Sequence, residues 1–303
     1  MPVLYLTEQG STLRKEGELF LVTKEDRELQ KIPAVQVEQV VLLGNIHLTT
    51  PVINHMLQEG IDCVFCNSYG KYHGRLISNE SKYGLLRQSQ METMKDAQKK
   101  QSIAREIVRG KFLNQRTLLM RYHRENNLIT LSEAIKSLDE CSGKLDKAED
   151  AGSLFGLEGY GSAQYYRAFK ELLKQDLGFT ARVRRPPTDP VNSMLSFGYT
   201  MLTYNMQSAV SVVGLDPFLG YLHVIEYSRP SLVLDLIEEF RPIIVDSLVL
   251  RIVNTNILTK ADFQTPEIQG GMVLLTQDAI KKFVHHYEER VQTVIQHPIT
   301  GHQ

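Results

Sequence analysis

Short apolar runs separated by glycines and polar turns mark the first 80 residues of the chain. Runs rich in β-branched and aromatic side chains are typical of strands, and they occur at 3–6, 18–23, 35–37, 40–43, 63–66 and 74–77. A short helix at 50–60 is predicted between the runs at 40–43 and 63–66, since Thr50 caps it, Pro51 fits its first turn and Gly60 ends it. The pattern therefore predicts a mainly β N-terminal region.

Helical spacing of apolar residues replaces this pattern from about residue 84 onward. A Gly-rich, charged loop is predicted at 143–156, and helices are predicted at 160–176, 190–213, 229–240 and 275–292. The change is one of composition rather than a distinct linker, so we place the boundary near residue 80. The chain is thus predicted to be an α+β protein, with a mainly β domain at 1–80 followed by an all-α domain at 81–303.

Composition excludes several classes of protein. Apolar residues make up 42% and charged residues 23% of the 303 residues, which is typical of a globular protein and not of a disordered tail, a collagen or a coiled-coil rod. No apolar run reaches the roughly 18 residues that span a bilayer, and residues 1–5 carry no basic segment. Three cysteines are too few for a disulfide framework. A cytoplasmic protein is therefore expected.

Charge is unevenly distributed, although the formal net charge is only −1. Residues 1–80 hold 10 acidic and 7 basic side chains, whereas residues 86–125 hold 10 Lys or Arg and 4 acids. Another basic cluster, Arg182, Arg184 and Arg185, precedes Pro186. Such clusters can hold nucleic-acid phosphates without reading sequence, or they can be solvated surface.

An acidic helix is predicted between Pro230 and Pro242. At ~100° per residue its apolar side chains cover one broad arc, and Asp235, Glu238 and Glu239 share the remaining gap. Carboxylates this close repel one another by ~0.2–0.5 kcal/mol per pair, and a divalent cation would remove that cost. Two interpretations remain: an acidic face in water, which spacing alone favours, or a Mg²⁺ or Mn²⁺ site.

Two further residues strengthen the metal interpretation. His223 precedes the acidic helix, and Glu158 lies between glycines in a predicted turn ahead of the helix at 160–176. Glycines beside a carboxylate allow the backbone to approach a ligand. Each residue also has a simpler interpretation, as a packed histidine and as a surface glutamate.

Three stretches then establish a resemblance: RRPPTDPVNSMLSFGYTML at 184–202, LDPFLGYLH at 215–223 and SLVLDLIEEFRPIIVD at 231–246. Together with Glu158-Gly159 and the helix after it, they closely resemble the CRISPR-associated spacer-acquisition integrase family, the first-numbered Cas protein, also described as a CRISPR-associated endonuclease. The resemblance covers the whole chain. The family usually has alanines where this chain has Gly161-Ser162; small size is kept, so no loss of function is expected.

The resemblance implies that Glu158, His223 and Glu238 are the catalytic residues and the ligands of a Mg²⁺ or Mn²⁺ ion. Asp235, one helical turn before Glu238, is an assisting acid in some relatives. The implied reaction joins a short foreign DNA fragment, the spacer, to a CRISPR repeat by transesterification. DNA-backbone contacts are expected at the basic residues Arg182, Arg184, Arg185, Lys99, Arg105 and Arg109.

The resemblance also implies partners. Relatives bind double-stranded DNA, form homodimers through the β-rich domain, and assemble with a small ferredoxin-like protein, the second-numbered Cas protein. Residues 1–80 are therefore expected to dimerise, and residues 81–303 to carry catalysis.

Three alternatives stay open. The chain could be a stand-alone metal-dependent DNA repair nuclease, or a DNA-binding protein without catalysis. A structural zinc site could use Cys63 and Cys66 with His55 and His73. A strand at 61–66 would put the two thiols on opposite faces, which disfavours the zinc site.

Overall fold

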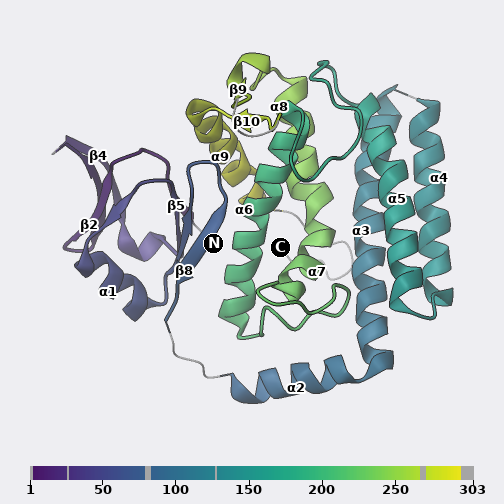
Figure 1. Cartoon of the computed structure of the whole chain (residues 1–303), viewed down its shortest axis with the longest axis horizontal. Helices are drawn as coiled ribbons and strands as arrows, with labels where there is room; N and C mark the ends of the chain where they lie inside the picture. The colour runs from purple at the N-terminus through teal and green to yellow at the C-terminus, as the bar shows by residue number, and fades with distance from the viewer. Residues whose placement is uncertain (1–2, 26, 79–82, 127, 267–270, 295–303) are drawn as a thin grey trace. The chain divides into compact units, whose positions relative to one another are not determined.

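A computed structural model describes residues 3–25, 27–78, 83–126, 128–266 and 271–294. The chain divides into two compact units, Met1–Asn79 with Leu275–Gln303, and Glu80–Leu274. Strands come first and helices follow, so the predicted α+β fold class is confirmed (Figure 1). The C-terminal segment from Leu275 groups with the N-terminal unit. The predicted boundary near residue 80 is therefore one of two boundaries, and the second, at 274–275, was not predicted. The roles assigned to the two domains remain predictions.

The first unit contains two four-stranded sheets. Three parallel strands and a final antiparallel strand form one sheet, in the order β1 (Val3–Leu6), β5 (Gln39–Leu43), β7 (Asp62–Cys66) and β8 (Tyr72–Leu76). The other sheet has the order β4 (Arg27–Pro33), β3 (Leu19–Lys24), β2 (Thr12–Glu16) and β6 (His47–Leu48), with only the β2–β6 pair parallel. The strands β2, β4 and β6 were not predicted, because their side chains are mostly polar.

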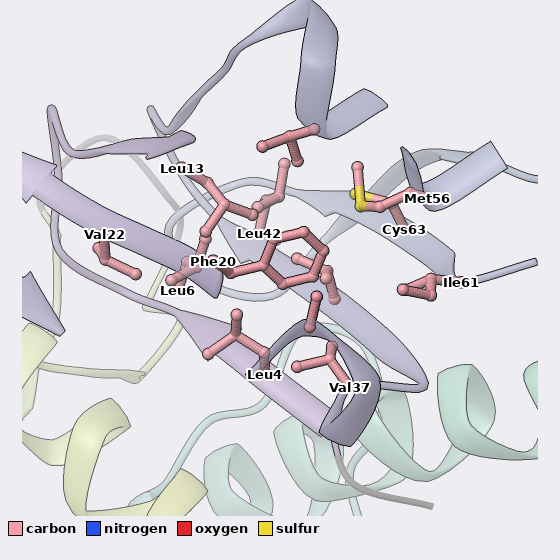
Figure 2. Packing of buried hydrophobic residues seen from close by; sticks show 13 residues of the cluster. Leu4, Leu6, Leu13, Phe20, Val22, Val37, Leu42, Met56, Ile61 and Cys63 are labelled. Atoms are coloured by element: carbon pink, nitrogen blue, oxygen red, sulfur yellow. The ribbon is translucent and has the colours of Figure 1, made fainter. Parts of the chain in front are cut away.

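The apolar runs of the sequence supply the core of this unit (Figure 2). Side chains of both sheets meet there, among them Leu42 of β5 and Phe20 of β3, and Met56 of α1 (Thr50–Glu59) covers them. Gly60 ends α1 with a left-handed φ of 70°, as predicted. The run at 35–37 is not a strand, because η1 (Ala34–Gln36) turns the chain there.

The helix α9 (Gln277–Val291) completes the first unit. Lys281 Nζ lies 3.0 Å from Glu8 Oε2, and Gln277 Nε2 donates to the Ser68 carbonyl at 3.3 Å. On its inner face Phe283 and Tyr287 are fully buried. These contacts explain why a helix from the far end of the chain belongs with the strands.

The second unit is helical. Three of its helices, α3 (Ala97–Asn126), α4 (Ile129–Lys144) and α5 (Ala151–Glu171), lie side by side (Figure 1). Further helices are α2 (Gly84–Lys95), α6 (Pro190–Val213), α7 (Ser231–Phe240) and α8 (Ser247–Asn254). Short elements are η2 (Leu145–Lys147), η3 (Arg241–Asp246), η4 (Lys260–Asp262), β9 (Phe263–Gln264) and β10 (Leu274–Leu275). Within the described ranges, no helix is long and apolar enough to cross a membrane.

The predicted loop at 143–156 and the predicted turn at Glu158 are wrong. Asp150 caps α5 by accepting a hydrogen bond from the Ser153 amide at 2.7 Å, and the helix starts at Ala151. Glu158 therefore lies within the helix. Of the glycines near Glu158, Gly161 has a packing role: a Cβ there would lie 2.5 Å from Cε1 of Phe112 on α3, whereas a Cβ at Gly156 or Gly159 would meet no atom within 4 Å. Glycine at position 161 allows the two helices to approach closely.

Pro242 was predicted to stop the acidic helix, and this is also wrong. Proline has no N–H to donate within a helix, yet the chain continues through the π-helical turn η3 directly into α8. The wider turn accommodates Pro242 without ending the helical path.

Two of the glycines of α5, Gly159 and Gly161, provide a matched test of this packing. Gly161→Ala should destabilise the fold by about 1–3 kcal/mol, because the ring it meets is buried and must move. Gly159→Ala meets no atom within 4 Å, and should be neutral or stabilising by up to about 1 kcal/mol. Urea unfolding of the two variants measures both changes. Equal effects would contradict a packing role for Gly161.

Candidate metal centre

The acids of α7 are buried. Asp235 is 0% and Glu238 is 4% exposed, so the acidic face in water, which spacing alone favoured, is wrong. Glu239 is half-buried beside α3, whereas Phe240 is exposed. A helical wheel shows which residues share a face but not which face the neighbouring helices cover. Buried carboxylates require hydrogen bonds or cations, and both are present.

Asp235 holds the loop that carries His223. Its carboxylate accepts the backbone N–H groups of Tyr221, Leu222 and His223 at 2.6, 2.9 and 2.8 Å. Its Oδ1 also lies 2.7 Å from Nδ1 of the His223 ring. An ionised carboxylate can only accept, so His223 carries its proton on Nδ1, and the lone pair of Nε2 is free to bind a cation.

This loop lies unusually close to α7. A Cβ at Gly220 would lie 2.6 Å from Cβ of Ser231 and 3.0 Å from Oδ2 of Asp235, so only glycine permits the approach. From α2, the buried Gln90 exchanges hydrogen bonds with both the amide and the carbonyl of Asp216, at 2.8 and 3.0 Å. The position of His223 is thus determined by two helices that flank its loop.

Glu158 and Glu238 share one cation. The ammonium of Lys111, on α3, contacts Oε1 of Glu158 and lies 2.7 Å from Oε2 of Glu238. Burial opposes ionisation of both acids, but Lys111 outweighs it and lowers the pKa of Glu158. With Arg241 added, the pKa of Glu238 falls to about 2. Ser162 Oγ also donates to Glu158 at 2.9 Å.

A buried network supports Glu238 from behind. Arg241 donates to Oε1 of Glu238 and stacks on the ring of Tyr199, 4.9 Å from its centroid. The hydroxyls of Tyr199 and Tyr165 donate to Asp246. Burial raises the pKa of Asp246 to about 6, although the two tyrosine hydroxyls partly offset the effect. The network fixes Arg241, and through it the orientation of the Glu238 carboxylate.

Lys111 was missed in the sequence because it lies within the basic run 86–125. The helix periodicity contains a signal: buried residues recur at helical spacing at Ala104, Val108, Gln115 and Leu119. Lys111 lies on the same stripe, three residues after Val108 and four before Gln115. A lysine on an otherwise buried helix face is expected to have a buried anionic partner.

The residues present fit a divalent cation by their chemistry. Two carboxylates and one imidazole suit Mn²⁺ or Mg²⁺. A metal-binding histidine usually donates its other ring N–H to a carboxylate, as His223 does to Asp235. In this structure, however, the ligand atoms of Glu158, His223 and Glu238 do not all lie within 4.8 Å of one another. Among the described residues, only His285, His286 and Glu289 place three such atoms within 4.8 Å of one another. The zinc alternative is not supported, since Cys63 and Cys66 belong to no such group in the described residues.

The predicted DNA contacts divide into two sets. Three are already hydrogen bonded inside the unit: Arg182 to Asn192 and Ser196, Arg105 to the Ala148 carbonyl, and Arg109 to Asp146. The other three, Lys99, Arg184 and Arg185, are exposed. DNA binding by any of them remains a prediction.

Comparison with known proteins decides the family. The model of the family described as CRISPR associated protein Cas1 matches residues 4–289. The chain belongs to the Cas1 family. A CRISPR-associated endonuclease Cas1 of Thermus thermophilus is 38% identical over 302 residues, which cover 99% of this chain and 87% of that protein. The predicted family and enzyme class are therefore confirmed, and nucleases of this family generally depend on a metal.

Solved structures agree. The Cas1 protein TM1797 of Thermotoga maritima is 28% identical, with a TM-score of 0.84 over 96% of this chain and 91% of that one. A chain of a Cas6-RT-Cas1–Cas2 complex is 26% identical, with a TM-score of 0.81 over 97% of this chain and 32% of that longer one. The arrangement of strands followed by helices is thus that of Cas1 structures.

Asp235→Asn tests the role of Asp235. The amide keeps the size but turns one of two accepting oxygens into a donor that faces backbone N–H groups. We expect a loss of about 2–4 kcal/mol, from one or two unpaired buried groups at ~1–3 kcal/mol each. We also expect an altered ¹⁵N NMR signal of His223, whose wild-type shifts should report the Nδ1–H tautomer.

Asp216→Asn is the control, because the oxygen that accepts the Phe218 amide at 2.8 Å can be kept. It should leave both the stability and the His223 signal close to wild type. An Nε2–H tautomer in the wild type, or an unchanged His223 in Asp235→Asn, would contradict the proposed hydrogen-bond arrangement.

Proposed function

We propose that this Cas1 chain joins short DNA fragments to the edge of a CRISPR repeat by metal-dependent strand transfer. The same site cuts DNA when water replaces the DNA 3′-hydroxyl. The observation that carries the proposal is an acid pair, partly buried Glu158 and buried Glu238, near a histidine whose tautomer Asp235 selects. Membership in a family of CRISPR-associated endonucleases supports it.

Each residue has a defined role in this proposal. Glu158, Glu238 and Nε2 of His223 would hold a Mg²⁺ or Mn²⁺ ion, with the imidazole favouring Mn²⁺. Such an ion, when bound, supplies a Lewis acid for the phosphoryl oxygens and lowers the pKa of a bound hydroxyl or water. Asp235 orients His223, and Arg241 orients Glu238. In the reaction one phosphorus–oxygen bond forms as another breaks, so the number of phosphodiesters is conserved.

The partners follow from the same family. The related complex is named for Cas6, RT, Cas1 and Cas2, and we extend the association with Cas2, the small ferredoxin-like partner, to this chain. Double-stranded DNA is the substrate, and exposed Arg184 and Arg185 are the favoured backbone contacts. A homodimer formed through the β-rich unit and a cytoplasmic location remain predictions.

Substitution of the proposed ligands should abolish cleavage and joining. Glu158→Gln, His223→Ala and Glu238→Gln should each lower Mn²⁺-dependent cleavage by at least about 100-fold, since even outer partners of a metal contribute roughly 10–100-fold. Cleavage of labelled duplex DNA is the measurement. Glu239→Gln is the control, because this acid lies on the same helix as Glu238 but packs against Gly110 of α3 and is not a proposed ligand. Burial and the nearby Glu106 raise its pKa. Near-normal cleavage by any of the first three variants removes that residue from the ligand set.

A branched DNA that mimics a half-joined fragment separates strand transfer from plain hydrolysis. The proposed site should release the fragment and reseal the repeat strand, because the exchange of phosphodiesters can proceed in both directions through one transition state. Gel analysis with an end label on the repeat strand detects the resealed product, which should be absent in Glu238→Gln. Cut product without resealing would favour the stand-alone repair nuclease, and no metal-dependent product would favour a non-catalytic DNA-binding protein.

A further inference from the structure

Lys111 contacts both carboxylates of the proposed metal site. It is 4% exposed, and a lysine is almost never buried to this degree unless it is paired. Its ammonium contacts one carboxylate of α5 and one of α7, Glu158 and Glu238. The partners of this single positive charge are thus the two acids proposed to hold a divalent cation.

The charges show what the ammonium does. Asp235 is satisfied by three backbone N–H groups and His223, and Arg241 contacts Glu238 from the opposite carboxylate oxygen. Glu158 contacts Lys111 and Ser162, and within the part of the chain that the structure describes no arginine pairs with it. Without Lys111, two carboxylates in a low-dielectric interior would repel each other, and Glu158 would have no counter-charge.

A divalent cation and this ammonium cannot share the place. Both would be bound by the same carboxylate oxygens, and like charges a few ångströms apart repel strongly inside a protein. The present arrangement agrees with this exclusion, since Glu158, His223 and Glu238 do not bring three ligand atoms within 4.8 Å of one another. The ammonium instead lies between the two carboxylates that would hold the metal.

We propose that Lys111 is a built-in cation that holds the two carboxylates in place until a divalent metal displaces its ammonium. Metal binding is then an exchange of one cation for another, and the competition lowers metal affinity. This inference rests on the proposed function, because it uses the same three ligands. It adds a residue that tunes the metal affinity and assigns it a position on α3.

The test compares Mn²⁺ affinities of the purified full chain, read from the electron paramagnetic resonance signal of free Mn²⁺. Lys111→Met keeps the length of the side chain and removes the charge. Suppose that the Lys111 ammonium is away from the carboxylates in about a tenth of wild-type molecules or fewer. Lys111→Met, in which no ammonium competes, should then bind Mn²⁺ about tenfold more tightly or more. Lys111→Arg keeps the charge and should bind no more tightly than wild type. Lys170→Met, at an exposed lysine of α5, should leave the affinity unchanged.

Two kinds of failure are distinguishable. If His223→Ala binds Mn²⁺ as well as wild type does, the metal site of the proposed function is wrong. If His223→Ala loses the ion but Lys111→Met binds it no more tightly than wild type, only the role of Lys111 is overturned.

A measurement on the wild type covers the case in which Lys111→Met does not fold. Amine labelling followed by mass spectrometry should show Lys111 protected without metal and several-fold more reactive with saturating Mn²⁺, whereas Lys170 stays constant. Unchanged labelling of Lys111 would overturn the displacement.

Discussion

The burial of carboxylates on α7 is the constraint on which the rest of the helical unit depends. Burying a carboxylate without a hydrogen-bond or ionic partner costs far more free energy than the packing of one helix contact contributes. Each acid on the buried face therefore has hydrogen-bond or ionic partners, and these come from different parts of the chain. Asp235 has the backbone of the loop before α7, and Glu238 has Lys111 of α3 and Arg241 of η3.

This constraint explains several features that look unrelated in the sequence. Gly220 allows the loop to reach Asp235, and Gly161 allows α5 to approach α3 near the residue that pairs with Glu158. The π-helical turn after Phe240 keeps Arg241 close to Glu238 while the chain passes Pro242. Both glycines and the irregular turn thus serve the same group of charges.

The two cations that contact Glu238 differ in freedom, because Arg241 is held in a hydrogen-bonded network whereas Lys111 has a flexible side chain. Tyr199, Asp246 and Arg241 form a buried network with hydrogen bonds and a stacked guanidinium, which has little freedom to rearrange. Lys111 has a flexible four-carbon side chain and holds its carboxylates through a single ammonium. A cation-binding site with this division can change its cation without moving the helices that carry the acids.

The sequence by itself determined the fold class, the succession of strands and then helices, and several helices such as α6. Through the family resemblance, whose motifs are long and ordered, it also predicts Glu158, His223 and Glu238 as the metal ligands. It did not show that Glu158 lies within a helix, since glycine in a sequence indicates a turn and a close helix contact equally well. Only the tertiary structure decided which face of α7 is covered, and therefore that its acids are buried. It alone brought Lys111 of α3 to Glu158 and Glu238, because helix periodicity can place a lysine on a buried face but cannot show which distant acids it meets.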